Sequence, residues 1–454
     1  MIERLSSDSR RCAPGVAFFA YPGETADGRD HIGDAIGRRA AAVLWEEAGF
    51  AWRAEWRVPN AAVSGLRSRA GSLAHEFYGR PSEALWTCGV TGTNGKTSCS
   101  QWLAALLGSR GEKCGVIGTL GSGFPGEFTP AANTTPDALE LHRTLAEMRN
   151  AGARAVAMEV SSHGLVQGRV NGVRFACALF TNLSHDHLDY HGSMQAYGEA
   201  KARLFESPGL QAAVLNLDDA FGVELARRLK GRVRTIGYSL APVAAAADEQ
   251  IVADEKWRLP VLGRFNVSNA LGVLGCLAAR GIPLGEGAQL LARLPAVPGR
   301  MQRVADEPLV VVDYAHTPDA LEKVLLALRP VAAERGGTLA VVFGAGGDRD
   351  PSKRAPMGAV ATRLADRVLV TSDNPRGEDP LAIISQIESG IAVKHEAEAD
   401  RKRAIEAAIA QAAREDVVLI AGKGHEDYQE IAGRRLPFSD AAVARAAVAA
   451  RGTR

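Results

Sequence analysis

The sequence carries almost no net charge, and this limits the partners it can have. Its 53 basic and 52 acidic side chains leave a formal net charge of +1, which indicates neither a nucleic-acid surface nor a basic face for a membrane. A small anionic ligand would therefore have to be held by local groups rather than by the overall field of the protein.

Long apolar runs and paired cysteines are also missing. No run of about 18 apolar residues occurs, and the first residues, MIERLSSDSRR, contain no apolar signal region. The six cysteines are scattered and form no Cys-x-x-Cys pair, a pattern that fits neither a disulfide framework nor a zinc knuckle. We therefore expect reduced thiols, no membrane insertion and a cytoplasmic location.

What the sequence does have is an alternation of short apolar runs and helical stretches, which predicts an α/β fold with parallel strands. Its 454 residues indicate about three domains, and we place the boundaries near Glu83 and Pro298. The predicted strands span residues 85–90, 154–160, 175–181, 213–217, 309–314, 338–343, 367–371 and 417–421, and helical spacing covers 98–107 and 318–328. Residues 240–255 indicate a surface excursion, and a helix is expected to start in GRFNVSN, residues 263–269.

The loops that follow these strands contain most of the polar side chains of chemical interest. They read TGTNGKTS, EVSSHG, TNLSHDHLD, DYAHTPDA, GAGGDRD, SDNPRGED and AGKGHEDY. In open parallel sheets, ligands bind beyond the carboxyl ends of the strands, so these loops predict one or two active-site rims.

The stretch TGTNGKTS, residues 91–98, predicts a nucleotide site. Phosphate requires backbone N–H donors at a helix N-terminus, a nearby cation and a hydroxyl group for Mg²⁺. Gly92 and Gly95 allow close approach of the backbone. Lys96 can reach phosphate and Thr97 can bind Mg²⁺. The common phosphate-loop spacing has glycine where this sequence has Val90, and the alternative interpretation is a glycine-rich turn from strand to helix.

Magnesium also prefers carboxylate ligands, and one stands at a strand end. Glu159 ends the apolar stretch AVAMEV, where a bare carboxylate would be costly. His187, in SHDHLDYH after the next strand, is a less usual Mg²⁺ ligand and by itself indicates a histidine at the rim.

Taken together, these motifs resemble the Mur ligase family of amide-forming enzymes. TGTNGKT is similar to that family's variant of the phosphate loop, in which Val90 is expected. The match covers most of the chain, through DSRR, NTTPD, EVSSHGLVQGRV, TNLSHDHLDYHG, GRFNVSN, PGRMQRV, DYAHTPDAL, GAGGDRDPSKR, DNPRGEDP and AGKGHEDYQ. The segment before DSRR and the stretches 121–133 and 238–262 are shorter than in the family's pattern.

The resemblance implies a three-domain architecture and an ATP-dependent amide ligase. Residues 1–83 would form an N-terminal UDP-substrate-binding domain, 84–298 a central ATP-binding domain with a P-loop ATPase-like parallel sheet, and 299–454 a C-terminal Rossmann-like domain that binds the incoming amino acid. ATP would phosphorylate the D-glutamate carboxylate of UDP-N-acetylmuramoyl-L-alanyl-D-glutamate, and an amine would displace phosphate from the acyl phosphate. Lys96 and Mg²⁺ would neutralise the two anions.

The resemblance also implies the site residues. The nucleotide would be bound by Gly92, Thr93, Asn94, Gly95, Lys96, Thr97 and Ser98, bordered by Asn266, Asn269, Arg300 and Asp313. The UDP-linked substrate would contact Ser7, Ser9, Glu24, Thr25, Ala26, Asn133, Thr134, Thr135, Ser161, Gln167 and Arg169. Metal would be held by Thr97, Glu159, His187 and a carbamylated Lys201, and the catalytic residues would be Lys96, Glu159, His187 and Lys201.

Local structure offers an alternative for several of these residues. Lys201 could be a solvated helix lysine, and Asn266 and Asn269 could cap a helix that starts at Val267. Thr134-Thr135-Pro136 could be an N-cap before Asp137, and Ser161 could form a turn at a strand end. Each alternative is reasonable alone and weaker for the whole set.

The sequence DNPR, residues 373–376, indicates which amino acid is added. An amino acid with a second amino-acid head needs a cation for its far carboxylate and acceptors for its ammonium. Arg376 offers a planar fork, and Asp373 and Glu426 offer acceptors. The resemblance implies meso-diaminopimelate rather than L-lysine, in a pocket of Arg349, Asp373, Asn374, Pro375, Arg376, Gly422 and Glu426. The alternative is an Asn-Pro turn with a surface arginine.

Two other functions stay open at this point. Folylpolyglutamate synthetase, a ligase of the same superfamily, would explain the phosphate loop and the lysine but neither DNPR nor NTTPD. A non-catalytic nucleotide-binding relic would leave the intact set of Lys96, Glu159, His187 and Lys201 without a role. The partners that the resemblance implies are small-molecule substrates, whereas the relic would bind nucleotide and regulate a partner.

Overall fold

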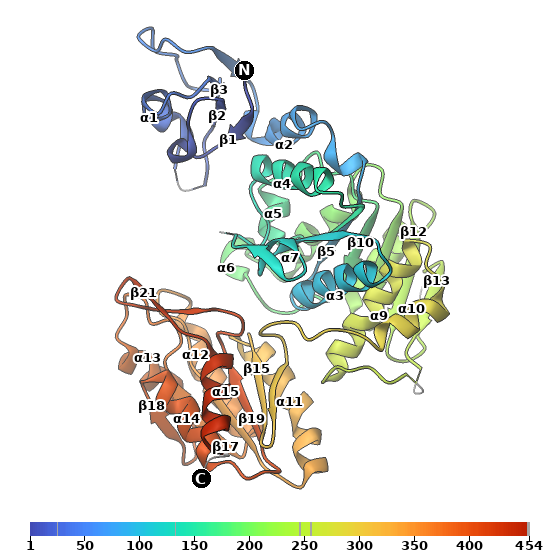
Figure 1. Ribbon diagram of the computed structural model, residues 1–454, viewed down its shortest axis with the longest axis vertical. Helices are drawn as coiled ribbons and strands as arrows, with labels where there is room; N and C mark the ends of the chain where they lie inside the picture. Colours follow the sequence, from blue (N-terminus) through green and yellow to red (C-terminus); the bar gives the residue numbers. More distant parts are fainter. Residues whose placement is uncertain (25, 132, 245–246, 255–256, 452–454) are drawn as a thin grey trace. The chain divides into compact units, whose positions relative to one another are not determined.

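The computed structural model describes residues 1–24, 26–131, 133–244, 247–254 and 257–451. These residues form two compact units, one of Met1–Asp254 with Ala270–Leu291 and the other of Glu255–Asn269 with Ala292–Arg454 (Figure 1). Helix α9 (Arg264–Ala279) runs from the second unit into the first. Among the described helices, none is long and apolar enough to cross a lipid bilayer.

The N-terminal part of the first unit is a small parallel sheet with the order β1-β2-β3-β4. Its elements are β1 (Arg4–Ser6), β2 (Val16–Ala20), α1 (Ile32–Gly37), β3 (Ala42–Glu46), β4 (Asn60–Val63) and α2 (Leu66–Phe77). Side chains alternate along β2, so Phe18 packs in the cluster with α1 and Phe19 in the cluster with α2. The sheet is therefore covered on both faces.

The rest of the first unit is built around a nine-stranded sheet with the order β13-β12-β11-β10-β5-β9-β6-β7-β8. Its strands are β5 (Trp86–Thr91), β6 (Cys114–Gly118), β7 (Gly121–Phe124), β8 (Glu127–Thr129), β9 (Ala155–Glu159), β10 (Cys177–Phe180), β11 (Ala212–Asn216), β12 (Arg234–Ser239) and β13 (Glu249–Val252). Its helices, besides α9, are α3 (Lys96–Ser109), α4 (Ala138–Asn150), α5 (Ser162–Val166), α6 (Leu188–His191), α7 (Met194–Ala202), α8 (Ala220–Leu229) and α10 (Leu284–Leu291). From β13 to β6 all pairs are parallel.

The four strands predicted for this region are confirmed to within a few residues. The expectation of a plain surface excursion at residues 240–255 is wrong in part, because β13 pairs with β12 there. Strand β5 lies between β9 and β10. Because these three strands are parallel, the residues that follow Thr91, Glu159 and Phe180 meet at one edge of the sheet.

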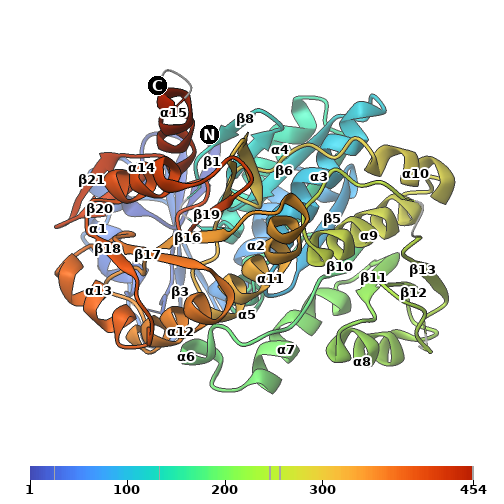
Figure 2. The ribbon, with the colours of Figure 1, turned by 90° about the horizontal axis from the view of Figure 1, so that it is seen from below.

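The second unit contains a six-stranded sheet with the order β14-β15-β19-β16-β17-β18, in which only β14 is antiparallel. Its elements are β14 (Gln302–Asp306), β15 (Leu309–Asp313), α11 (Pro318–Arg335), β16 (Leu339–Phe343), α12 (Arg354–Leu364), β17 (Arg367–Thr371), α13 (Pro380–Glu388), β18 (Glu396–Glu398), α14 (Arg401–Gln411), β19 (Val417–Ala421) and α15 (Asp440–Arg451), with the hairpin β20 (Tyr428–Ile431) and β21 (Arg434–Pro437). Helices α11, α12 and α13 cover one face and α14 and α15 the other (Figure 2). The four predicted strands of this sheet are confirmed.

A buried ion pair joins helices α14 and α15 to the strand ends of this sheet. Arg401 and Asp440 have fully buried side chains, and Arg401 donates from Nε and Nη2 to the two carboxylate oxygens at 2.8 and 2.7 Å. The same guanidinium donates to the carbonyl oxygens of Ser372 and Ala421, which follow β17 and end β19. A buried charge is tolerated only when it is paired and hydrogen-bonded, as it is here.

We predict that Asp440→Ala lowers the free energy of unfolding of the second unit by about 3–5 kcal/mol, because it leaves the Arg401 charge buried without its partner. Urea unfolding followed by circular dichroism measures this loss. The matched control is Glu406→Ala, which breaks a 3.9 Å pair between exposed side chains of Lys402 and Glu406 on the same helix α14. An equal effect of the two substitutions would contradict the structural role of the buried pair.

Candidate active site

The predicted phosphate loop lies between strand β5 and helix α3, as an anion site at a helix N-terminus requires. Gly92 and Gly95 have φ angles of 147° and 88°, values that favour glycine. A Cβ atom at Gly92 would lie 1.9 Å from Thr181 Oγ1, so the close approach excludes a side chain. Val90 is a fully buried residue of β5 itself, so the loop begins after this position.

The end of strand β10 holds this loop in place. The backbone N–H of Thr93 donates to the carbonyl oxygen of Asn182 at 2.8 Å, and that of Asn94 donates to the Asn182 side-chain oxygen at 3.0 Å. Thr181 Oγ1 donates in turn to the carbonyl of Asn94 at 2.6 Å. Asn182 lies in the motif TNLSHDHLD, but the sequence alone does not single it out, because its contacts with the loop depend on the pairing of two distant strands.

Lys96 opens helix α3, and its ammonium lies over the loop. Its Nζ donates to the carbonyl oxygens of Gly92 and Thr93, both at 2.8 Å. The ammonium is therefore held against the backbone of this loop. Ser98 is buried in the same turn of the helix.

Glu159 is a carboxylate at the end of β9 with only 1% of its surface exposed. It accepts hydrogen bonds from Thr97 Oγ1 at 3.1 Å, from the Thr119 backbone N–H at 2.8 Å and from Thr119 Oγ1 at 3.1 Å. A Cβ atom at Gly118 would lie 2.2 Å from its Oε1. The predicted metal ligands Thr97 and Glu159 are thus in direct contact, and their oxygen donors suit Mg²⁺. Thr119 was not foreseen from the sequence.

Lys201 is buried in helix α7, with 1% of its surface exposed, so the alternative of a solvated lysine is wrong. Its Nζ lies 4.2 Å from the centre of the Tyr197 ring. Burial lowers the pKa of Lys201 well below its ordinary value, the charge of Lys96 lowers it further, and Asp186 opposes the shift. Burial and the Lys96 charge thus both favour the uncharged form of this amine.

His187 lies next to the same group of side chains, in the left-handed region with φ of 53°. Burial lowers the pKa of His187, and Asp186, whose carboxylate is 3.5 Å away, opposes this. The charges of Lys96 and Lys201 both act on His187. His187 and Lys201 both lie beside Tyr197, whose ring centre is 6.1 Å from that of His187 and 4.2 Å from Lys201 Nζ.

A second set of predicted residues forms a hydrogen-bonded chain within the first unit. Thr135 is fully buried and donates to the Glu159 carbonyl at 3.0 Å, and its Oγ1 lies 3.1 Å from Ser161 Oγ. Arg169 donates to the Thr135 carbonyl and to Gln167, both at 2.7 Å. Gln167 donates to Glu24 at 2.7 Å. This chain joins the site around Glu159 to the N-terminal sheet region.

The remaining predicted contacts of the UDP-linked substrate are spread around this chain. Ser9 is buried in a short helix capped by Asp8, Ala26 accepts from the Gly23 N–H at 2.8 Å, and Thr134 Oγ1 lies 3.1 Å from Thr119 Oγ1. Burial raises the pKa of Tyr21, and a hydrogen bond with the Ser7 side chain opposes this shift. Thr25 lies outside the described residues. The N-cap alternative for Thr134-Thr135-Pro136 is wrong, since Asp137 caps α4, whereas Ser161 does cap α5.

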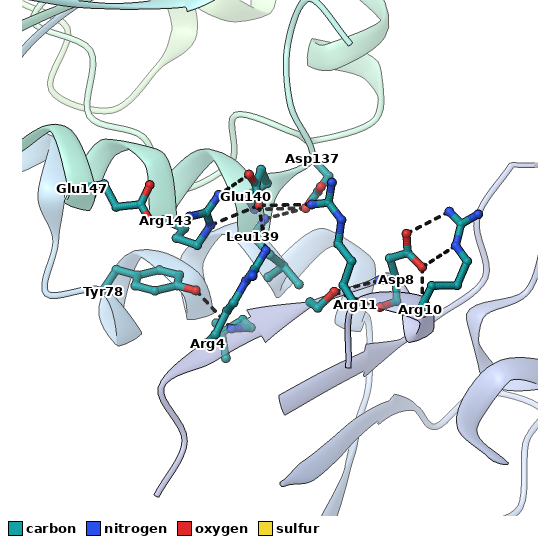
Figure 3. A network of polar contacts seen from close by, with 12 residues as sticks. Arg4, Asp8, Arg10, Arg11, Tyr78, Asp137, Leu139, Glu140, Arg143 and Glu147 are labelled. Carbon is teal, nitrogen blue, oxygen red and sulfur yellow. Dashed lines mark hydrogen bonds and ion pairs between the residues drawn. The ribbon is translucent and has the colours of Figure 1, made fainter. Parts of the chain in front are cut away.

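Asn133 lines a cavity of about 300 Å³ together with Arg11, Asp137, Glu140 and Arg143. Figure 3 shows the ion pairs beside it: Arg11 and Arg4 lie 3.5 and 3.8 Å from Glu140, and Arg143 pairs with Glu140 and Glu147. The carboxylates neutralise much of this basic cluster, so the cavity is polar rather than strongly cationic.

The predicted nucleotide-border residues belong to the second unit. Helix α9 begins at Arg264, so Asn266 and Asn269 lie inside it and the capping alternative is wrong. Burial raises the pKa of Asp313, Arg300 opposes this shift, and the carboxylate accepts from the backbone N–H of Met301 at 2.7 Å. The Arg300 guanidinium lies 4.5 Å from the centre of the Tyr314 ring.

The DNPR loop follows β17 and is fixed by its neighbours. Arg376 exchanges backbone hydrogen bonds with strand β20, donating to the Glu430 carbonyl at 3.0 Å and accepting from the Ala432 N–H at 2.7 Å. Its Nη1 donates to the Gly347 carbonyl at 2.6 Å. Next to it, a Cβ atom at Gly346 would lie 3.0 Å from Arg376 Nη1 and 3.8 Å from Arg349 Cγ, so the two predicted arginines lie on the same side of this pocket.

Lys423 is a fully buried cation that links three parts of this pocket. Its Nζ donates to Asn374 Oδ1 at 3.0 Å and to Glu426 Oε2 at 2.9 Å, and Asn374 Nδ2 also donates to Glu426 at 2.8 Å. Gly422 lies beside Asp373, because a Cβ atom there would be 2.4 Å from Asp373 Oδ2. The predicted residues of this pocket are thus held together by a lysine that the sequence did not single out.

Comparison with protein families gives three matches that together cover most of the chain. The Mur ligase family catalytic domain matches residues 1–78, the Mur ligase middle domain residues 90–277, and the Mur ligase glutamate ligase domain residues 299–424.

Known relatives match over the whole length. The UDP-N-acetylmuramoyl-L-alanyl-D-glutamate–2,6-diaminopimelate ligase of Chromobacterium violaceum is 52% identical over 100% of this chain and 95% of its own. The protein of the same name from Pseudomonas aeruginosa is 52% identical over 99% and 96%. A solved structure with this name superposes with a TM-score of 0.68 at 37% identity, covering 99% of this chain and 95% of the other. The chain has the three-domain α/β fold of these proteins and belongs to the Mur ligase family of ATP-dependent enzymes.

Proposed function

We propose that this chain adds meso-diaminopimelate to the D-glutamate of UDP-N-acetylmuramoyl-L-alanyl-D-glutamate, with ATP as co-substrate, in the synthesis of peptidoglycan precursors. The observation that carries the proposal is the fixed position of Arg376, whose backbone is paired with strand β20 beside Arg349. A pre-positioned planar guanidinium suits a far carboxylate, which diaminopimelate has and L-lysine lacks. The names of the relatives support the same reaction.

The reaction needs two steps that conserve all atoms. An oxygen of the D-glutamate carboxylate attacks the γ-phosphorus of ATP and releases ADP, giving an acyl phosphate. The amine of diaminopimelate then attacks the carbonyl carbon, loses a proton, and expels inorganic phosphate as the amide forms. The loop of Gly92–Ser98 and the ammonium of Lys96 hold the phosphates.

We propose that Mg²⁺ binds at Thr97 and Glu159, with His187 and a carbamylated Lys201 as further ligands. The hydroxyl and carboxylate oxygens already in contact fit this ion. When bound, Mg²⁺ would neutralise the charge shared by the phosphates and the substrate carboxylate. The lowered pKa of Lys201 supports carbamylation, because only an uncharged amine can react with CO₂.

The substrate sites follow from the same clusters. We assign the UDP-linked substrate to the chain Thr135–Ser161–Arg169–Gln167–Glu24 and its surroundings, and the nucleotide border to Asn266, Asn269, Arg300 and Asp313. Domain boundaries near residues 83 and 298 are part of this proposal. Because ATP and UDP-linked precursors are cytoplasmic metabolites, we place the reaction in the cytoplasm.

The choice of amino acid is tested by supplying ATP, Mg²⁺, the UDP-linked dipeptide and equal concentrations of meso-diaminopimelate and L-lysine. We expect almost exclusive formation of the diaminopimelate product. Equal incorporation of L-lysine would refute the assignment of Arg376.

We predict that Arg376→Ala lowers kcat/KM for diaminopimelate by roughly ten- to a hundredfold, mainly through KM, because a charge-assisted contact remote from the reacting amine is lost. The matched control is Arg435→Ala, since Arg435 also lies near the Glu430 carboxylate, at 3.7 Å, but is largely exposed. Steady-state kinetics of phosphate release measures both. A loss confined to kcat would contradict the assigned role.

We predict that Lys201→Ala lowers kcat by about 10²–10³-fold, the loss typical of a group that stabilises transition-state charge. Added formate or acetate should restore part of the activity by replacing the carbamate. The control is Lys230→Ala, at an exposed lysine of the same unit. If the variant is folded and stays inactive with these acids, the carbamate role fails.

A further inference from the structure

Three cysteines that the proposed reaction does not use meet inside the central domain. Cys88 lies on β5, Cys177 on β10 and Cys276 on α9, and all three are fully buried. Their sulfur atoms lie within 4.8 Å of one another, with Cys88 Sγ and Cys276 Sγ 3.8 Å apart. Scattered in the sequence, they form a cluster only through the fold.

Two features of the packing bring these sulfurs together. Cys88 and Cys177 are register partners on neighbouring parallel strands, so their side chains leave the same face of the sheet. Helix α9 approaches this face closely at its glycines: a Cβ atom at Gly275 would lie 2.5 Å from Val214 Cγ1, and one at Gly272 would lie 3.0 Å from Leu179 Cδ1. This close approach places the thiol of the next residue, Cys276, next to the thiols of Cys88 and Cys177.

The spacing of the sulfurs suits a metal ion at their centre better than a disulfide. A disulfide requires sulfurs about 2.05 Å apart, far less than the 3.8 Å between Cys88 and Cys276. An ion with metal–sulfur bonds of about 2.3 Å in a trigonal plane would separate its ligands by about 4.0 Å. The 3.8 Å between Cys88 Sγ and Cys276 Sγ, with all three sulfurs within 4.8 Å of one another, is compatible with this triangle.

The ligand set selects the kind of ion. Thiolates prefer soft ions such as Cu(I) and Zn²⁺, and structural Zn²⁺ almost always takes four ligands. No fourth histidine, cysteine or carboxylate joins this group among the residues that the structure describes. All three sulfur ligands lie in fully buried residues.

Charge gives a second reason to choose a monovalent ion. Burying a net charge in an apolar interior is costly. A Cu(I) ion that displaces one thiol proton to solvent leaves the net charge of the site unchanged, with one thiolate and two thiols as ligands and no change of oxidation state.

We propose that Cys88, Cys177 and Cys276 form a three-coordinate binding site for one monovalent copper ion. The site lies on the two strands that lead to the phosphate loop, because the loop follows β5 and Asn182, which binds the loop, follows β10. A bound ion ties these two strands to helix α9. It therefore stabilises the central domain against unfolding.

The test is an anaerobic titration of the full-length protein with Cu(I) supplied as its bicinchoninate complex, by direct addition and by refolding in its presence. Copper per chain, the midpoint of thermal unfolding and the X-ray absorption spectrum are measured. We expect one copper per chain, three sulfur neighbours and a raised midpoint, by either route of loading. Cys88→Ala, Cys177→Ala and Cys276→Ala should each lose at least about tenfold in copper affinity.

Matched controls are Cys99→Ala and Cys114→Ala, which remove equally buried thiols of the same unit outside the cluster. They should bind copper as the unmodified protein does. The proposal is overturned if the unmodified protein takes up no copper by either route, if the controls lose copper as the cluster variants do, or if absorption shows fewer than three sulfurs. Because each variant is also checked for its thermal transition, failure to fold is recognised separately.

Discussion

The buried carboxylate of Glu159 is the interaction on which the central site depends. A carboxylate removed from water must be hydrogen-bonded, and Glu159 meets this requirement by binding Thr97 at the start of α3 and Thr119 after β6. It thereby fixes helix α3, which follows the phosphate loop, to the end of strand β6, which is the neighbour of β9. The buried amine of Lys201 lies near the same edge, within range of the Lys96 charge. Polar groups held rigidly in a dry site stabilise developing charge more strongly than the same groups in water.

The second unit uses buried cations in the same way. Arg401 holds the ends of β17 and β19 through carbonyl oxygens, and Lys423 holds Asn374 and Glu426 at the tips of the following loops. Each cation is buried and donates to several oxygen acceptors, so its loss would leave polar groups unsatisfied. The loop that carries Arg376 is therefore positioned before any ligand arrives, which reduces the ordering cost of binding.

The sequence analysis predicted several elements with strong apolar runs but missed others, such as β2, whose sequence VAFFA is buried throughout. The eight predicted strands of the two larger sheets are present, because runs such as LVVVD and VVLIA are buried on both faces. The N-terminal strands were not foreseen; β4, with the exposed sequence NAAV, has no such pattern. Lys201 shows the limit for single residues, since its helix sequence reads as exposed and only tertiary packing buries it. Motifs located Thr97 and Glu159, whereas Asn182, Thr119 and Lys423 become visible only through contacts between distant segments.

The central claim is that this edge brings a substrate carboxylate against the terminal phosphoryl group of ATP. The most direct measurement uses UDP-linked dipeptide labelled with ¹⁸O in both oxygens of the D-glutamate carboxylate that becomes the amide. Mass spectrometry of the products then follows the label. The account predicts that one labelled oxygen per turnover appears in the released inorganic phosphate and the other stays in the new amide. Unlabelled phosphate accompanying amide formation would contradict it.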